Sequence, residues 1–411
     1  MVVAALSAVA CGDDDDDEDA SDDATASEQT QEEGEASDGE GSKDSLIAQF
    51  PEDVHELLED LPENLIQLLL EVREAGPSDF VWANDGGEFE EAEQRAFKEE
   101  WEEITGWTIV QSTADRTSSN ALLKTQVDAG NVEASVYEVA DAGIAQQFAS
   151  EGYLEELDLS FFQVEAFPPG SPINEFSVDI VDYASGIGYN TDVFPEGEEP
   201  TSPLDIFDLE NFPGKRCLFS FPQFNSVFEF ALMADGVAFE DVFDVLRTDE
   251  GVEQARAKIE SIVGEVVWID TYAESVQFLV DGECDIALTA NNRVALRLLD
   301  EPDLPLAFVQ EGGTLWTTPI GIPEGAPEYR AALSAIAYAV VPRNQCDILN
   351  ITAIGILMDA PPFPDCLSDF ARERGVNPEV VVGGSDSADP TFWAERNEVL
   401  QEVLTEIQTG N

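Results

Sequence analysis

Basic residues and histidine are both scarce in this chain. Its 411 residues include 18 Lys plus Arg against 87 Asp plus Glu, a formal net charge of −69, and a single histidine, His55. A chain so acidic repels nucleic acid and anionic lipid surfaces. Because His55 precedes the main body, Ser-His-Asp and Cys-His catalysis and histidine-rich zinc sites are excluded from that body. The acidity names no ligand, since solubility in a salty medium is the simpler explanation.

Long apolar runs and cofactor motifs are absent too. No segment approaches the roughly 18 continuous apolar residues of a membrane-spanning helix. Neither a CxxC pair nor a phosphate-cradling glycine-rich loop stands out, so we expect no metal site and no cofactor. The hydrophobic content of 43% is typical of a globular protein, and the length suffices for two lobes with large cores.

The first 11 residues resemble the end of a lipoprotein signal peptide. Met1 to Ala10 reads MVVAALSAVA, apolar and small, and Cys11 follows where the family carries its lipidated cysteine. The segment departs from the pattern in having no positive n-region. The resemblance implies a lipid-anchored, extracytoplasmic protein attached to the cell membrane through Cys11. A free, buried cysteine is the alternative.

Residues 12–44 form a strongly acidic segment. They contain 16 acidic residues and one lysine, separated by small and polar residues. Such a composition cannot bury a core, so we expect disorder. As a tether, a flexible chain of about 33 residues spans roughly 30 Å. The alternative is a solvated tail with no anchoring role.

Residues 45–76 change character and predict two short helices. Pro51 and Pro62 each precede acidic residues, which is typical of the first turn of a helix. Leucines and other apolar residues supply a buried face. The segment either docks on the body or forms a hairpin that binds a partner.

The body alternates strands and helices with short turns, which predicts an α/β fold. A strand over 80–84 precedes a helix over 88–104 and a strand over 107–110. Ligands of open α/β sheets bind beyond the carboxyl ends of strands, so Trp82, Asn84 and Asp85 are candidate contacts. Asp141 ends a later strand and is either a contact or the cap of the following helix.

A strand over 185–190 with alternating small residues is followed by turns and by the tight turn 212–216. The order and spacing of these and other pieces resemble the bacterial extracellular solute-binding proteins of ABC importers, in their spermidine/putrescine branch. The other pieces are Ala231 to Val237, Thr248 to Gly251, Val267-Trp268, Asn291 to Arg293, Trp316 and Phe392 to Ala394.

The resemblance implies a two-lobe periplasmic-binding-protein-like (type II) fold with a hinge and an interlobe cleft. Residues 79–182 plus 316–411 would form lobe 1 and residues 183–315 lobe 2, with the chain leaving near Tyr183 and returning over 315–323. Such a protein is a monomer that closes over a small solute and delivers it to an ABC permease and ATPase. It is not an enzyme.

A polyamine site needs carboxylates and aromatic faces. Trp82 and Trp316 match the family, but the positions of its cation ligands hold Pro222, Gln223, Ser226 and Thr318, and an aromatic position holds Ala290. The solute is therefore polyamine-like or another small polar molecule. The candidate ligand-binding residues are Trp82, Asn84, Asp85, Asp141, Asp182, Tyr183, Gln223, Glu229, Asp270, Asn291, Asn292, Trp316 and Thr318.

Four cysteines besides Cys11 suggest two disulfides in an exported chain. We expect Cys346 to pair with Cys366, 20 residues apart, and Cys217 to pair with Cys284, on strands of the same inferred lobe.

Two other functions stay open. A glycoside hydrolase needs paired carboxylates, which chance supplies in so acidic a chain. A ferric-iron protein usually has closely placed tyrosines, and none of the seven here are adjacent.

Overall fold

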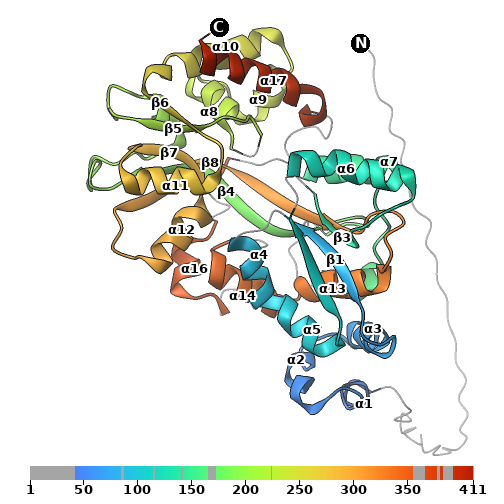
Figure 1. Ribbon diagram of the computed structural model, residues 1–411. Coiled ribbons are helices and arrows are strands. Elements are labelled where there is room, and N and C mark those ends of the chain that lie inside the picture. The colour runs from blue at the N-terminus through green and yellow to red at the C-terminus, as the bar shows by residue number, and fades with distance from the viewer. Residues whose placement is uncertain are drawn as a thin grey trace, which may run out of the picture. The chain divides into compact units, whose positions relative to one another are not determined.

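The computed structural model describes residues 42–84, 88–113, 116–139, 142–164, 173–223, 225–354, 366–376, 380–382 and 392–410. Among the predicted residues, Cys11, Asp85 and Asp141 lie outside these ranges, as does most of the acidic segment. The described part is a mixed α/β structure built on one eight-stranded sheet (Figure 1). This is the fold class that the sequence predicted.

The strand order in the sheet is β2-β1-β3-β8-β4-β7-β5-β6. The three strands at one end are parallel to each other, as are the three at the other end, and the two long strands between them run antiparallel. The strands are β1 (Asp79–Asn84), β2 (Thr108–Thr113), β3 (Val136–Glu138), β4 (Val178–Asn190), β5 (Arg216–Phe219), β6 (Val266–Ile269), β7 (Ile286–Ala290) and β8 (Leu306–Gly321).

We use "first lobe" for β1–β3 with the helices packed on them, and "second lobe" for β5–β7 with theirs (Figure 1). The first lobe contains α4 (Glu88–Glu93), η2 (Gln94–Lys98), α5 (Glu99–Thr105), α6 (Arg116–Ala129), α7 (Ala142–Glu151), α13 (Tyr329–Ala339) and α14 (Pro342–Thr352). The second contains η5 (Pro203–Phe207), α8 (Val227–Ala234), α9 (Phe239–Leu246), α10 (Asp249–Glu260), α11 (Tyr272–Asp281) and α12 (Asn291–Asp300). The short helix α16 (Asp369–Arg374) contacts both α12 and α14.

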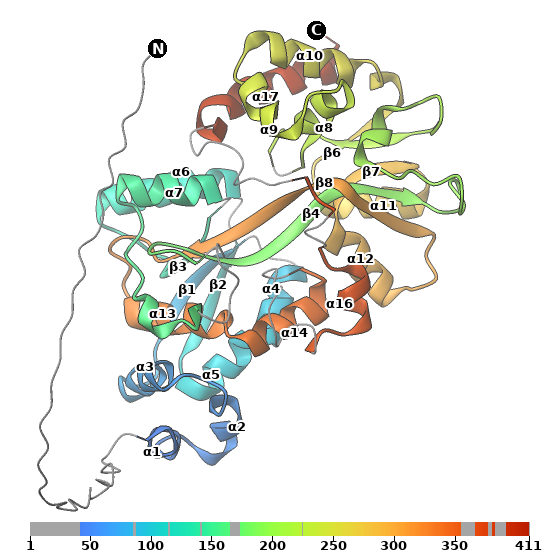
Figure 2. The same ribbon diagram turned by 180° about the vertical axis from the view of Figure 1, so that it is seen from behind.

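The segment before β1 docks on the first lobe. It forms α1 (Lys43–Ile47), η1 (Glu52–Val54), α2 (His55–Leu58) and α3 (Glu63–Glu74). Helix α3 lies beside α13 and α5 (Figure 2) and buries six apolar side chains in the main core. The indole of Trp107 donates to the carbonyl of Val72 at 2.9 Å. Of the two alternatives left open by the sequence, the structure shows docking on the body.

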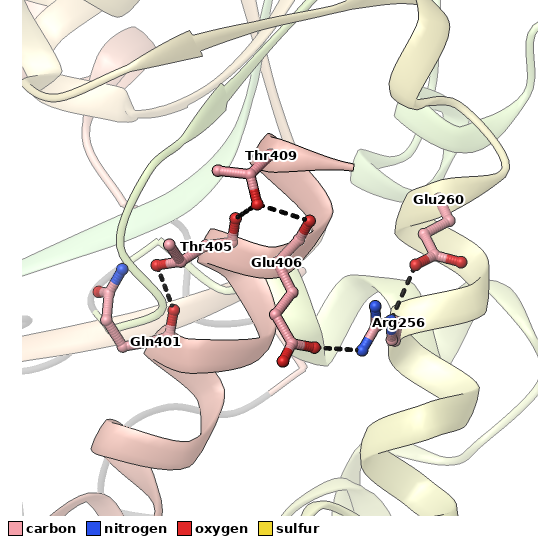
Figure 3. A network of polar contacts seen from close by, with 6 residues as sticks. All are labelled: Arg256, Glu260, Gln401, Thr405, Glu406 and Thr409. Atoms are coloured by element: carbon pink, nitrogen blue, oxygen red, sulfur yellow. Dashed lines mark hydrogen bonds and ion pairs between the residues drawn. The ribbon is translucent and has the colours of Figure 1, made fainter. Parts of the chain in front are cut away.

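The C-terminal helix α17 (Phe392–Thr409) corrects the predicted lobe division. The resemblance implied that residues 316–411 belong to the lobe of β1–β3 but left the lobe of the C-terminal helices open, and α17 packs on α10 of the second lobe. Glu406 of α17 reaches Arg256 of α10, which also binds Glu260 (Figure 3). The physical reason is apolar burial, because the rings of Phe392 and Trp393 pack edge-to-face against Phe243.

Two disulfides join the described cysteines in the expected pairs. Cys217 of β5 is linked to Cys284, and Cys346 of α14 is linked to Cys366. The first closes the second lobe across 67 residues of chain, and the second ties α14 to the segment that leads into α16. No helix within the described ranges has the length and apolarity needed to span a bilayer.

Candidate functional site

The two long strands β4 and β8 connect the lobes. Their ladder extends from the pair Val178–Ile320 to the pair Asn190–Leu306, and both strands pass from one lobe into the other (Figure 1). A register shift between Ser185 and Ile187 marks the crossing. A Cβ on Gly186 would lie 2.3 Å from the carbonyl oxygen of Val309, so only glycine permits this close approach.

The predicted residues Tyr183 and Trp316 are paired directly across this ladder, and Asp182 and Thr318 pair beside them with Thr317 and Val181. All four predicted side chains are buried, with exposed fractions of 9% or less. The crossing thus brings together four of the candidate residues that the sequence proposed from separate segments.

Hydroxyl groups tie the second lobe to the crossing strands. Ser226, which precedes α8, bonds to Thr314 through their hydroxyls at 2.6 Å, and the indole Nε1 of Trp316 donates to Ser226 Oγ at 3.1 Å. Ser185 of β4 donates to the carbonyl of Asn225 at 3.1 Å. The role of Ser226 and Thr314 was missed from sequence, because Ser226 stood out only as the position of an absent acid.

Asn291 makes a second tie to the crossing. Its Oδ1 accepts from the backbone N–H of Ala184 at 3.0 Å, and its Nδ2 donates to the carbonyls of Ala353 at 3.0 Å and Arg374 at 3.1 Å. The side chain is therefore bonded to the protein backbone, although the sequence proposed it as a solute contact. The neighbouring Asn292 is also buried, at 5% exposure.

A charged cluster lies buried at the ends of the first-lobe strands. Lys98 and Glu93 form an ion pair at 2.7 Å with both side chains fully buried. Asn84 donates to the same glutamate oxygen at 2.9 Å. The ammonium of Lys98 lies 4.4 Å from the ring centroid of Trp82, whose Nε1 donates to Glu138 at 3.3 Å. The predicted residues Trp82 and Asn84 thus belong to an internal polar network.

The sequence offered no signal for Lys98, Glu93 or Glu138. Lys98 and Glu93 are five residues apart, and η2 between them is a π-helical turn in which the N–H of Glu99 bonds to the carbonyl of Gln94. Residues three or four apart share a face of an α-helix, whereas the wider π turn aligns residues five apart. Looking in the sequence for charged residues three or four apart therefore does not pair Lys98 with Glu93.

Three remaining candidates are scattered over the second lobe. Gln223 precedes α8 and is buried, and its carbonyl accepts from Asn225 Nδ2 at 3.0 Å. Glu229 lies within α8 at 1% exposure, and burial raises its pKa to about 8. Asp270 is exposed at the end of the edge strand β6, where it accepts from the hydroxyl of Ser220. Asp270 is therefore separated by two strands from β4.

A small pocket adjoins the crossing. It has a volume of about 210 Å³ and lies between α12, β8 and α16. Its lining residues include Glu373, Arg374, Asn291 and Gln310. Across the described ranges, no group of three or more His, Cys, Asp or Glu side chains is placed to hold a metal ion.

A fold of two α/β lobes joined by crossing strands defines a class of binding protein, and comparison with known proteins identifies the family. Residues 95–369 match the model of the bacterial extracellular solute-binding proteins. This chain belongs to that family and is a solute-binding component of an ABC importer, acting outside the cytoplasm. Its relatives are solute-binding proteins rather than enzymes.

Three individual proteins show how similar this chain is to known solute-binding proteins. The gamma-aminobutyric acid-binding protein of Pseudomonas aeruginosa is 27% identical over 320 residues, which cover 77% of this chain and 87% of the relative. The structure of the Atu4243–GABA receptor superposes with a TM-score of 0.67 at 25% identity, covering 80% of this chain and 97% of the receptor. MotA from A. tumefaciens B6 in complex with glucopine gives 0.65 at 26% identity, with coverage of 80% and 99%. These likenesses do not single out the spermidine/putrescine branch.

Proposed function

We propose that this protein captures a small solute that carries both an amino group and a carboxylate, of the type of γ-aminobutyric acid (GABA). The observation that carries the proposal is the 27% identity to a GABA-binding protein over 77% of the chain.

Local chemistry favours a zwitterion over a polyamine. Polyamines carry only positive charge and need carboxylates at the site. Ser226, Gln223 and Thr318 occupy positions where the resemblance implies carboxylates in a polyamine site. Ser226 takes part in a neutral hydrogen-bond network, and Thr318 lies in the β4–β8 ladder. Asp182 is the acidic candidate that lies on the crossing strands themselves.

The solute contacts belong, in this proposal, to the region between the ends of β1 and β3 and the start of α8 and α12. The candidates in this region are Tyr183 and Thr318 on the crossing strands, Gln223 before α8 and Asn292 at the start of α12. The protein would be a monomer, held at the membrane by lipidated Cys11 and the acidic tether, and would hand its solute to the permease.

Isothermal titration calorimetry tests the solute class. We expect GABA or a related amino acid to bind with one site per chain, while spermidine and putrescine give no saturable single site. A chain of charge −69 attracts any polycation, so each titration is repeated at about 0.15 M and about 1 M NaCl, where screening removes surface binding.

A zwitterion with no net charge should keep its affinity at both salt concentrations. Single-site polyamine binding that persists at high salt would overturn the proposed solute class and restore the polyamine assignment. Opines, sugars and ferric iron complete the screen, and turnover of a glycoside would replace the binding function with an enzymatic one. If no solute binds, the proposed function fails.

A further inference from the structure

The side chain of Asn291 connects segments that are far apart in the sequence. Its three hydrogen bonds, at 3.0, 3.0 and 3.1 Å, reach β4 at Ala184, the end of α14 at Ala353 and the end of α16 at Arg374. Asn291 itself is the first residue of α12 and is 2% exposed. The Asn291 side chain thus links the helix α12 to the crossing strand β4 and to two backbone carbonyls, at the end of α14 and at the end of α16.

Both hydrogens of the Nδ2 group are used by backbone carbonyls, and Oδ1 is used by a backbone N–H. Removing this amide leaves the N–H of Ala184 and the carbonyl of Ala353 without this partner, which is a costly outcome for buried polar groups. It also frees the half-buried carbonyl of Arg374. The amide is therefore committed to the protein, and Asn291 acts on a solute only through the chain that it positions.

Backbone strain coincides with the same junction. Among the described residues, Ser226 and Ala353 are the non-glycine residues with positive φ, at 62° and 58°. Residues with a Cβ hold this conformation only where the surroundings fix it, and such positions cluster at functional and switching sites. Ala353 is fixed through its carbonyl by Asn291, and Ser226 through its hydroxyl by Thr314 and Trp316. Ser226 is thus bonded directly to the crossing strand β8, and Ala353 is linked to the crossing strand β4 through Asn291.

We propose that Asn291 is the positioning residue of the hinge, and that its amide sets the relative placement of the crossing strand, α12 and the segment after α14 that solute capture requires. This proposal rests on the solute-binding function. Closure of two lobes over a solute repacks the segments that join them. When the placement is lost, part of the solute's binding free energy is spent on restoring it, and affinity falls without loss of any direct contact.

The test compares Asn291→Ala and Asn291→Asp with the matched control Asn344→Ala. Asn344 is 0% exposed and its Nδ2 donates to the carbonyl of Tyr338 at 2.7 Å, but both residues lie within the first lobe. Asn291→Asp keeps the acceptor for Ala184 and replaces the donor by an oxygen that faces two carbonyls. Thermal unfolding ranks the stability of the three variants, and stopped-flow fluorescence with GABA gives the association and dissociation rates.

We expect both Asn291 variants to bind GABA at least about tenfold more weakly than the wild type, mainly through faster dissociation. Asn344→Ala should lose a comparable amount of thermal stability and keep its affinity within about twofold. Equal affinity in the wild type and Asn291→Ala would overturn the proposal, as would an equal loss of affinity in Asn344→Ala, because the effect would then be one of stability alone.

Hydrogen exchange without solute separates this proposal from the proposed function. In Asn291→Ala the N–H of Ala184 should exchange at least about tenfold faster, and so should the amides around Ala353, while the strands β1–β3 keep their protection. If GABA fails to bind the wild type, this pattern still decides the proposal. Unchanged exchange at Ala184 and around Ala353 would refute it.

Discussion

Glu93 in the first lobe and Glu229 in the second are both buried, at 0% and 1% exposure, but they have different neighbours. Glu93 accepts hydrogen bonds from the ammonium of Lys98 and the amide of Asn84. Neither oxygen of Glu229 has a hydrogen-bond partner among the described residues. Burial raises the pKa of Glu229 to about 8, so its neutral form is favoured at neutral pH.

The comparison shows two ways of burying a carboxyl group. In the first lobe an adjacent cation compensates the charge, and the group becomes part of a network that includes Trp82. In the second lobe a proton neutralises the carboxyl, which then packs as a polar but uncharged side chain in α8. Charge compensation depends on a partner that mutation can remove, whereas protonation depends on pH.

Removing the cation should have the largest effect. Lys98→Met leaves Glu93 as a buried carboxylate without its ammonium, and we expect the free energy of unfolding to fall by about 3 to 5 kcal/mol. Urea denaturation at pH 7 measures it. The control Lys215→Met breaks the half-exposed pair with Glu265 and should have a much smaller effect, because solvent screens this pair.

The double variant Glu93→Gln with Lys98→Met sharpens this result. It removes the uncompensated charge and should recover part of the lost stability. If Lys98→Met alone costs no more than Lys215→Met, the first-lobe pair is not a compensated buried charge, and the comparison with Glu229 loses its basis.

Glu229→Gln should have an effect whose size depends on pH. The pKa in the folded protein, about 8, lies above the ordinary value of 4.5, so the folded state binds the proton more tightly. The stability that comes from this tighter proton binding is fully present below about pH 4.5 and is lost as the pH rises through about 8. The variant cannot ionise, and we expect it to match the wild type near pH 4.5 and to be more stable by about 4 to 5 kcal/mol at pH 9.

Chemical denaturation at several pH values from 4.5 to 9 checks this prediction. Glu253→Gln, on the exposed face of α10, removes one negative charge without changing a buried group and serves as the control. A stability difference between Glu229→Gln and the wild type that stays constant with pH would show that Glu229 keeps the same protonation state in the folded and unfolded protein.

The smallest effect is expected at the surface. Glu406→Gln breaks the contact between α17 and Arg256, in which Glu406 is 41% exposed and Arg256 retains Glu260 (Figure 3). We expect a loss of about 0.5 kcal/mol or less in thermal unfolding, and a smaller one at high salt. Glu398→Gln on the same helix is the control, and a loss above about 1.5 kcal/mol would mean that this ion pair, rather than apolar packing, holds α17 in place.

Much of the fold followed from local sequence. Alternating small residues before Asn190 indicated a strand at the crossing, and the structure explains them by the close approach of Gly186 to Val309. The pairing Cys346–Cys366 was accessible because the cysteines are near in sequence. The position of α17 could not be predicted from the sequence, since its contacts with Phe243 and Arg256 join residues about 150 apart.

The candidate site was predicted in part. Tyr183, Trp316 and Thr318 do lie on the crossing strands, because their positions follow from strand register. The sequence could not show that the amide of Asn291 is fully used by backbone groups, since its partners Ala184, Ala353 and Arg374 carry no signal in their side chains.

The family, the α/β alternation and the strong acidity follow from the order, period and composition of the residues. Which buried polar groups find a partner depends on contacts between distant segments. A π-helical turn brings Lys98 to Glu93, no described group does the same for Glu229, and three distant segments meet at Asn291. The physical reason is that the energy of a buried polar group depends on partners within about 3 Å, and the folded chain chooses those partners regardless of their distance in sequence.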